Sequence, residues 1–70
     1  MAEGLSNRLR DLRAERDLTQ AALAEMVGVS RKTINTVENN VFIPSTILAL
    51  RLARALGAPV EQLFWLEDQA

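Results

Sequence analysis

The spacing of apolar side chains along the chain predicts helices. Leu5, Leu9 and Leu12 recur at intervals of four and three residues among charged and polar neighbours, which is the period of one face of an α-helix. Leu23 and Val27 repeat the interval of four. We therefore expect an all-α protein with helices over approximately residues 6–16, 20–27, 31–39, 46–56 and 60–64.

The residues that flank these helices indicate where each begins and ends. A serine or threonine before a helix accepts a hydrogen bond from an amide of the first turn, and a glycine after it takes the left-handed backbone that ends it. Such residues are Thr19, Ser30 and Ser45 before helices and Gly28 and Gly57 after them. Because a single residue separates Gly28 from Ser30, the second and third helices are joined by a tight turn. This arrangement over residues 20–39 is typical of a helix-turn-helix.

The third predicted helix has an apolar face and a polar face. Ile34 and Val37 are expected to pack inward, which leaves four residues on the opposite side: Arg31, Lys32, Asn35 and Thr36. Arginine and lysine donate to guanine, asparagine pairs with adenine, and a threonine methyl group contacts thymine. We expect these four residues to contact bases in the DNA major groove, where the second helix of a helix-turn-helix lies.

Phosphate contacts are expected around the same motif. Helix N-termini carry free amides that suit phosphate groups, so Gln20 and Ser45 are candidates at the starts of the second and fourth helices. The Gln20 side-chain amide also donates. We extend the expectation to Ser30, Thr33 and Asn40.

The length and composition of the chain limit the classes of function that it can have. The 70 residues suffice for one domain over 1–70, and the absence of histidine and cysteine removes the commonest metal ligands and general base. No apolar run approaches the roughly 20 residues of a membrane span, and the N-terminus lacks the apolar core of a signal peptide. We expect a cytoplasmic protein that is not an enzyme, with no metal, cofactor or membrane partner.

The charges are unevenly distributed, although the formal net charge is only −1. Between Met26 and Val60 the single acid is Glu38, whereas the basic residues there are Arg31, Lys32, Arg51 and Arg54. Proteins that bind nucleic acid usually carry a basic excess, and a local cationic segment serves the same purpose. The basic middle of the chain is therefore where a nucleic acid is expected to bind.

Two groups of apolar residues lie outside the helical pattern. Phe64, Trp65 and Leu66 are consecutive, so one short helix cannot bury all three, and tryptophan is favoured at interfaces. We expect these three residues, with Ile47, to form a dimer interface, the alternative being one aromatic that closes the monomer core and another that is exposed. The tail is predicted to extend as a short strand that pairs either with its symmetry mate or with residues 1–4.

The loop NNVFIPS between the third and fourth helices also carries apolar residues. Phe42 and Ile43 are expected to anchor this loop, and we interpret Phe42 as a residue of the core rather than as a stacking platform for bases. The dipeptide Pro44-Ser45 marks the start of the fourth helix.

These features occur together in a specific order. The segment LRDLRAERDLTQAALAEMVGVSRKTINTVENN, followed by PS and ALRLARALG, resembles the XRE/Cro-cI family of bacterial and phage repressors over about residues 5–64. The ordered run T-Q-x-x-L-A-x-x-x-G-V-S-R-x-T-I is far more specific than a single glycine turn. The resemblance implies a five-helix lambda-repressor-like domain that binds operator DNA as a homodimer. It also implies an ion pair between the first and third helices, here Arg13 and Glu38.

The chain departs from the family pattern at two places. Asn40 and Val41 stand where members often carry Gly-Lys, so one cation that contacts phosphate is missing. Thr46 and Ile47 stand where Leu-Glu is usual, which places an apolar side chain at a position that is otherwise charged. The first departure bears on affinity for DNA, and the second indicates an added contact surface.

The sequence therefore favours a homodimeric repressor that occupies a palindromic operator in double-stranded DNA. The alternative is a protein-interaction module, such as an antitoxin-like subunit, whose acidic C-terminus and apolar patch bind a protein of unknown identity. The low isoelectric point favours this alternative, whereas Arg31 and Lys32 at the recognition position favour the repressor. A controller protein of a restriction system is a variant of the repressor that the sequence does not separate from it.

Overall fold

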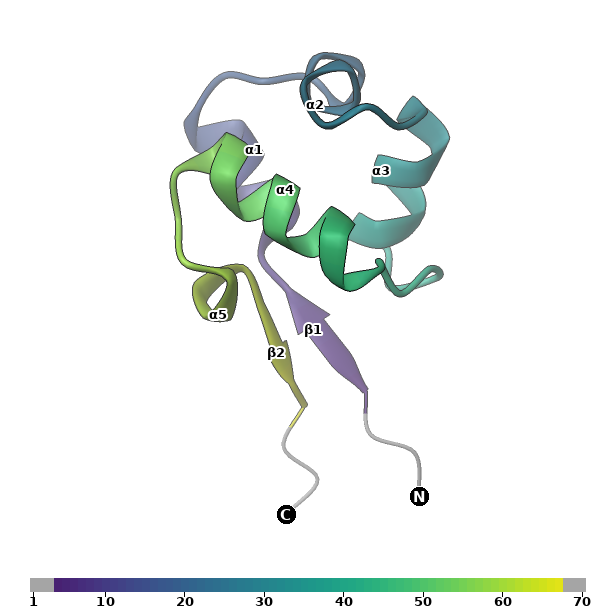
Figure 1. Cartoon of the computed structure of the whole chain (residues 1–70), viewed down its shortest axis with the longest axis vertical. Helices are drawn as coiled ribbons and strands as arrows, with labels where there is room; N and C mark the ends of the chain where they lie inside the picture. The colour runs from purple at the N-terminus through teal and green to yellow at the C-terminus, as the bar shows by residue number, and fades with distance from the viewer. Residues whose placement is uncertain (1–3, 68–70) are drawn as a thin grey trace.

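The computed structural model describes residues 4–67, which form five helices and a two-stranded sheet (Figure 1). The helices are α1 (Leu9–Glu15), α2 (Gln20–Val27), α3 (Arg31–Glu38), α4 (Thr46–Leu56) and α5 (Val60–Leu63). The strands are β1 (Leu5–Asn7) and β2 (Phe64–Leu66). The helices make up the body of the molecule, and the two strands project from it as a ribbon (Figure 1). No helix within the described residues has the length and apolarity needed to cross a membrane.

The ends of the chain differ from the all-α prediction. The first helix begins at Leu9 rather than near Ser6, because residues Leu5–Asn7 pair antiparallel with Phe64–Leu66 in the register Leu5 to Leu66. The expected tail strand is therefore present, but its partner is β1 of the same chain. One further bond, from the Glu67 amide to the Gly4 carbonyl, measures 2.8 Å. Residues 1–3, which were part of the predicted partner segment, lie outside the described residues.

The helical spacing of the apolar residues near the N-terminus predicts an earlier start for α1 than the structure has. Leu5 continues the period of Leu9 and Leu12, but its backbone pairs with β2 instead of extending the helix. Asn7 marks the boundary between β1 and α1, since its Oδ1 accepts a hydrogen bond from the Leu9 amide at 3.0 Å. Aromatic residues such as Phe64 and Trp65 favour extended backbone, so β2 supplies a partner that local periodicity does not reveal.

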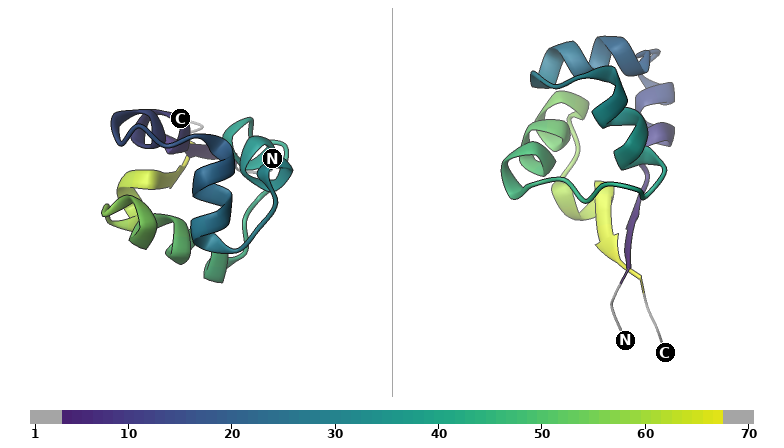
Figure 2. Two further views of the ribbon diagram at one scale, coloured as in Figure 1. Left: turned by 90° about the horizontal axis from the view of Figure 1, so that it is seen from above. Right: turned by 90° about the vertical axis from the view of Figure 1, so that its right-hand side faces the viewer.

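The core lies between the helices, and α2 packs against both α3 and α4 (Figure 2). All five helices and β2 contribute to it. Its fully buried members are Leu9, Leu23, Ile34, Val37, Leu52, Leu56 and Leu63. Burying one such aliphatic side chain contributes about 1.5–3 kcal/mol relative to leaving it exposed. This core holds α3 by one face and leaves the other face open.

The predicted helix boundaries around the tight turn are confirmed. The hydroxyls of Thr19, Ser30 and Ser45 each accept a hydrogen bond from an amide in the first turn of the following helix. Gly28 ends α2 at φ +78°, and Gly57 ends α4 at φ +66°. Only glycine adopts such angles without steric cost, so a side chain at either position would strain the turn.

The loop after α3 does not anchor in the core, and the prediction for Phe42 and Ile43 is wrong. Asn40 adopts a left-handed backbone at φ +60°, which asparagine tolerates better than most residues. The chain then folds back, and the amides of Val41 and Phe42 both donate to the Thr36 carbonyl, at 2.9 and 3.2 Å. These bonds hold the loop against the end of α3 and leave its apolar side chains largely exposed.

Candidate nucleic-acid interface

Helix α3 presents a buried face and an open face, as the sequence predicted. Ile34 and Val37 are buried in the core, whereas Arg31, Lys32 and Asn35 are exposed. Thr36 is partly exposed on the same open side. In the right-hand view of Figure 2, α3 lies at the front of the body, with no other helix covering it. The four candidate base contacts therefore lie on one accessible surface.

The hydroxyl groups of α3 are engaged within the helix itself. Ser30 Oγ accepts from the Thr33 amide at 3.1 Å and lies 2.9 Å from Thr33 Oγ1. Thr36 Oγ1 donates to the Thr33 carbonyl at 2.9 Å. Thr36 therefore has no free proton to donate to a base. The strong donors that remain at the start of α3 are the charged groups of Arg31 and Lys32.

The side-chain amide of Asn35 lies in a series of hydrogen bonds between side-chain amides of α2 and α3. Its Oδ1 accepts from Gln20 Nε2 at 3.2 Å and from Asn39 Nδ2 at 3.2 Å. These two bonds occupy the oxygen and leave the Asn35 Nδ2 group as the donor for a base. A bidentate pair with adenine would require the oxygen to exchange one of its present partners.

Glu38 ties α3 to both preceding helices from a buried position. Its side chain is 0% exposed, and Arg13 Nε donates to its Oε2 at 2.7 Å. Gln20 Nε2 donates to its Oε1 at 3.0 Å, and Arg10 Nε lies 3.6 Å from the same oxygen. Arg13 also donates through Nη1 to the Leu18 carbonyl at 2.8 Å, beyond the end of α1. The ion pair implied by the family resemblance is thus the centre of a larger cluster.

The surroundings of Glu38 keep it ionised. Burial alone would raise the pKa of this carboxyl, because a charge is poorly solvated inside a protein. The hydrogen bonds from Arg13 and Gln20 and the charges of Arg13 and Arg10 act in the opposite direction, and the net pKa lies below its ordinary value of 4.5. The folded protein therefore holds Glu38 as a carboxylate that positions α3.

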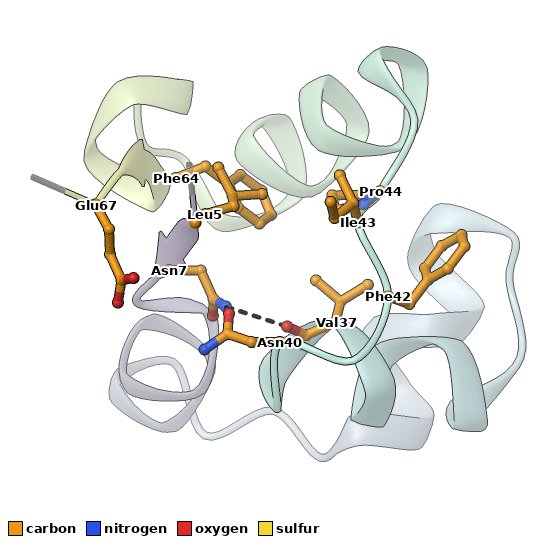
Figure 3. Close-up of a pocket in the computed structure, with 10 residues that line it drawn as sticks. Leu5, Asn7, Val37, Asn40, Phe42, Ile43, Pro44, Phe64 and Glu67 are labelled. Atoms are coloured by element: carbon orange, nitrogen blue, oxygen red, sulfur yellow. Dashed lines mark hydrogen bonds between the residues drawn. The ribbon is translucent and has the colours of Figure 1, made fainter. Parts of the chain in front are cut away.

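Two residues that position α3 were not predicted. Asn7 Nδ2 donates to the Val37 carbonyl at 3.1 Å and to Asn40 Oδ1 at 2.9 Å, which fastens the end of α3 to β1 (Figure 3). Arg10 Nη2 donates to Asn39 Oδ1 at 3.0 Å. The position of Arg10 three residues before Arg13 on one face of α1 was a usable signal for the arginine. Asn7 carried no such signal, because its contacts are with residues 30 and 33 positions away.

The remaining phosphate candidates lie at helix boundaries. Gln20 begins α2 with its amide nitrogen directed to Glu38 and Asn35, and Ser45 accepts from the Leu48 amide at 3.1 Å at the start of α4. Asn40 lies just beyond α3, with its Oδ1 bonded to Asn7. Contacts of these residues with phosphate stay predictions.

The residues expected at a dimer interface do not all have the same surroundings. Phe64 is buried in the monomer core, so its expected place at an interface is corrected. Strand pairing explains this, because successive residues of β2 point to opposite sides and Phe64 points toward the helices. Trp65, Leu66 and Ile47 are exposed, with Trp65 at 41%.

A profile of the helix-turn-helix family matches residues 9–63 of this chain. The uncharacterized HTH-type transcriptional regulator YgzD of Bacillus subtilis is 37% identical over 65 residues, covering 93% of this chain and 98% of the relative. An uncharacterized HTH-type transcriptional regulator of Methanothermobacter thermautotrophicus is 49% identical over 61 residues, covering 86% and 88%.

Solved structures agree with this family. The restriction-modification controller protein C.AhdI from Aeromonas hydrophila superposes with a TM-score of 0.75 at 34% identity, covering 79% of this chain and 83% of that one. The P22 c2 repressor, solved in complex with a synthetic operator, superposes with a TM-score of 0.75 at 35% identity, covering 77% and 82%. The predicted lambda-repressor-like fold is therefore confirmed. The chain belongs to the XRE/Cro-cI family of helix-turn-helix proteins and is a DNA-binding transcriptional regulator.

Proposed function

We propose that this protein is a homodimeric repressor that occupies a palindromic operator. The observation that carries the proposal is the pair Arg31 and Lys32, both exposed, in the first turn of α3. In a helix-turn-helix the N-terminal residues of the second helix contact base edges in the major groove. Arg31 and Lys32 donate to guanine, Asn35 donates through its free amide, and Thr36 contacts bases through its methyl group.

Contacts to the DNA backbone set the register of the protein on the duplex. Gln20 at the start of α2 and Ser45 at the start of α4 bring helix N-termini to phosphates on either side of α3. Ser30, Thr33 and Asn40 add further polar groups along α3 and its following loop. The positions of α1 and α2 relative to α3 depend on Glu38, so the buried cluster supports the geometry of binding.

The dimer interface is proposed at the ribbon and the start of α4. Trp65 and Leu66 of β2 and Ile47 of α4 are exposed apolar side chains, which are common at the centres of interfaces. A groove of about 260 Å³ lies between the ribbon and the loop before α4, lined by Leu5 and Phe64 from the ribbon and by Ile43 and Pro44 from the loop (Figure 3). A second copy that covers these residues supplies the second recognition helix for the other half-site.

The decisive experiment selects binding sites from random duplex DNA and measures affinity at several salt concentrations. We expect a palindromic site whose half-sites lie about one helical turn apart, near 10–10.5 base pairs. We also expect log affinity to fall linearly with log salt concentration, since each neutralised phosphate releases about 0.9 counterion. Binding without sequence preference, or with no dependence on salt, would contradict the proposal and favour the protein-interaction module.

Replacing Trp65 by alanine should weaken the dimer and lower affinity for the operator. The Trp65 side chain is 41% exposed, and its residue pairs with Ser6 on the ribbon. Its loss therefore removes contact area from the proposed dimer interface without leaving a cavity in the hydrophobic core of the monomer. Sedimentation equilibrium of both proteins gives the dimer dissociation constant, and circular dichroism checks that the helices persist. Met26→Ala on α2, which removes another exposed apolar side chain, is the matched control. A wild-type protein that stays monomeric at micromolar concentrations would rule out this interface.

A further inference from the structure

An apolar notch lies beside the base-reading residues of α3. It is an open surface hollow of about 310 Å³, lined by Lys32, Thr33 and Thr36 of α3 and by Val41 and Phe42 of the following loop. Val41 is 75% exposed and Phe42 is 47% exposed, although both are apolar. Both side chains are in contact with solvent next to a DNA-binding helix. Within the described part of the chain, no other side chain covers them.

The position of the notch is held by the backbone. The amides of Val41 and Phe42 both donate to the Thr36 carbonyl, so the loop is fastened to the same turn of α3 that carries a base-reading side chain. The left-handed residue Asn40 makes this return possible, and Asn7 holds Asn40 in place through a 2.9 Å hydrogen bond. The notch is therefore continuous with the recognition surface.

The lining offers little to a polar ligand. The Thr36 hydroxyl proton is used by the Thr33 carbonyl, and the Thr33 hydroxyl is paired with Ser30. The backbone amides of the loop are used as well. What remains is the ring of Phe42, the branched side chain of Val41 and the threonine methyl groups, with the Lys32 ammonium at the edge. Such a lining favours a small apolar group that is next to negative charge.

We propose that this notch receives the C5-methyl group of a thymine at one position of each half-site, and this proposal rests on the proposed binding of an operator by α3. Thymine is the only base that presents a methyl group in the major groove. Lys32, which we propose donates to guanine, lies at the edge of the notch, so the thymine would neighbour that guanine in the major groove. Phe42 and Val41 thus select thymine by burial of its methyl group rather than by a hydrogen bond.

Deoxyuridine tests the proposal because it differs from thymidine only by the C5-methyl group. Each thymine of the selected operator is replaced in turn, and the affinity of the wild-type protein is measured. We expect a loss of about fourfold at one symmetric position per half-site, as for burial of one methyl-sized group. Phe42→Ala should bind the thymine operator more weakly and show almost no further loss with uracil at that position.

The matched control is Met26→Ala, which removes an exposed apolar side chain of α2 that lines neither the notch nor the groove at the ribbon. It should keep the full discrimination between thymine and uracil. A wild-type protein that selects an operator with steep salt dependence, yet tolerates uracil at every position, would overturn the notch proposal and leave the proposed function standing. The notch proposal is also overturned if Phe42→Ala retains the wild-type uracil penalty, since the methyl group is then recognised by other residues. Failure to select any operator would overturn both.

Discussion

Replacing Arg13 by alanine should lower the free energy of unfolding by about 3–5 kcal/mol, because it leaves the Glu38 carboxylate buried without its main partner. Glu38 has a fully buried side chain, and Arg13 supplies both its 2.7 Å hydrogen bond and its nearest positive charge. The bond from Arg13 to the Leu18 carbonyl is lost at the same time. A loss of this size approaches the total stability of a small domain. Urea denaturation followed by circular dichroism measures it directly.

The control is Arg16→Ala, which removes an arginine near the end of α1 that donates to the Leu12 carbonyl at 3.2 Å and lies 3.8 Å from the Glu15 carboxylate. Such a hydrogen bond contributes about 0.5–1.5 kcal/mol and such a surface pair about 0–1 kcal/mol, so this variant should lose clearly less stability than Arg13→Ala. If Arg13→Ala unfolds as the control does, the cluster does not hold α3.

The same cluster makes stability depend on pH. The pKa of Glu38 is lower in the folded protein than its ordinary value of 4.5, so the unfolded chain takes up the proton first as the pH falls. The stabilisation is therefore complete above pH 4.5 and is lost as the pH falls through the lower folded pKa. Arg13→Ala should lose less stability than the wild type over this interval, as urea denaturation at a series of pH values would measure.

Replacing Arg31 by alanine should reduce affinity for the operator by about 1–3 kcal/mol per half-site and relax base preference at one position of each. Arg31 is exposed at the start of α3 and makes no hydrogen bond or ion pair with another described side chain, so its removal should leave the fold unchanged. Fluorescence anisotropy on the selected operator, and on variants at each position, measures both effects.

Arg51→Ala is the matched control, because it removes the same charge from an exposed position on α4, beside a groove against α2. This variant should keep the sequence preference of the wild type. Equal losses for the two variants on all sequences would show that Arg31 contributes only net charge, and unchanged base preference in Arg31→Ala would remove it from base readout.

Local patterns predicted the middle of this protein well. The caps at Thr19, Ser30 and Ser45 and the left-handed turn at Gly28 form hydrogen bonds within three or four residues, so the sequence around each one contains all that is needed. The two faces of α3 follow in the same way from the helical period.

The ribbon, the notch and the buried cluster depended on the tertiary structure. Leu5 matched a helical period, yet its backbone partner was a strand near the other end of the chain, and that pairing directs Phe64 inward. Phe42 was expected inside because it is large and apolar, but the fold-back after Asn40 leaves it exposed beside α3.

The sequence by itself determined the helix-turn-helix, its recognition face and its family, because these depend on short-range capping, periodicity and an ordered motif. Only the tertiary structure decided that Arg10 and Gln20 join Arg13 at Glu38, and that Asn7 holds the end of α3. The physical reason is that each of these contacts joins residues at least 18 positions apart, and which of many polar side chains meet is set by how the helices pack.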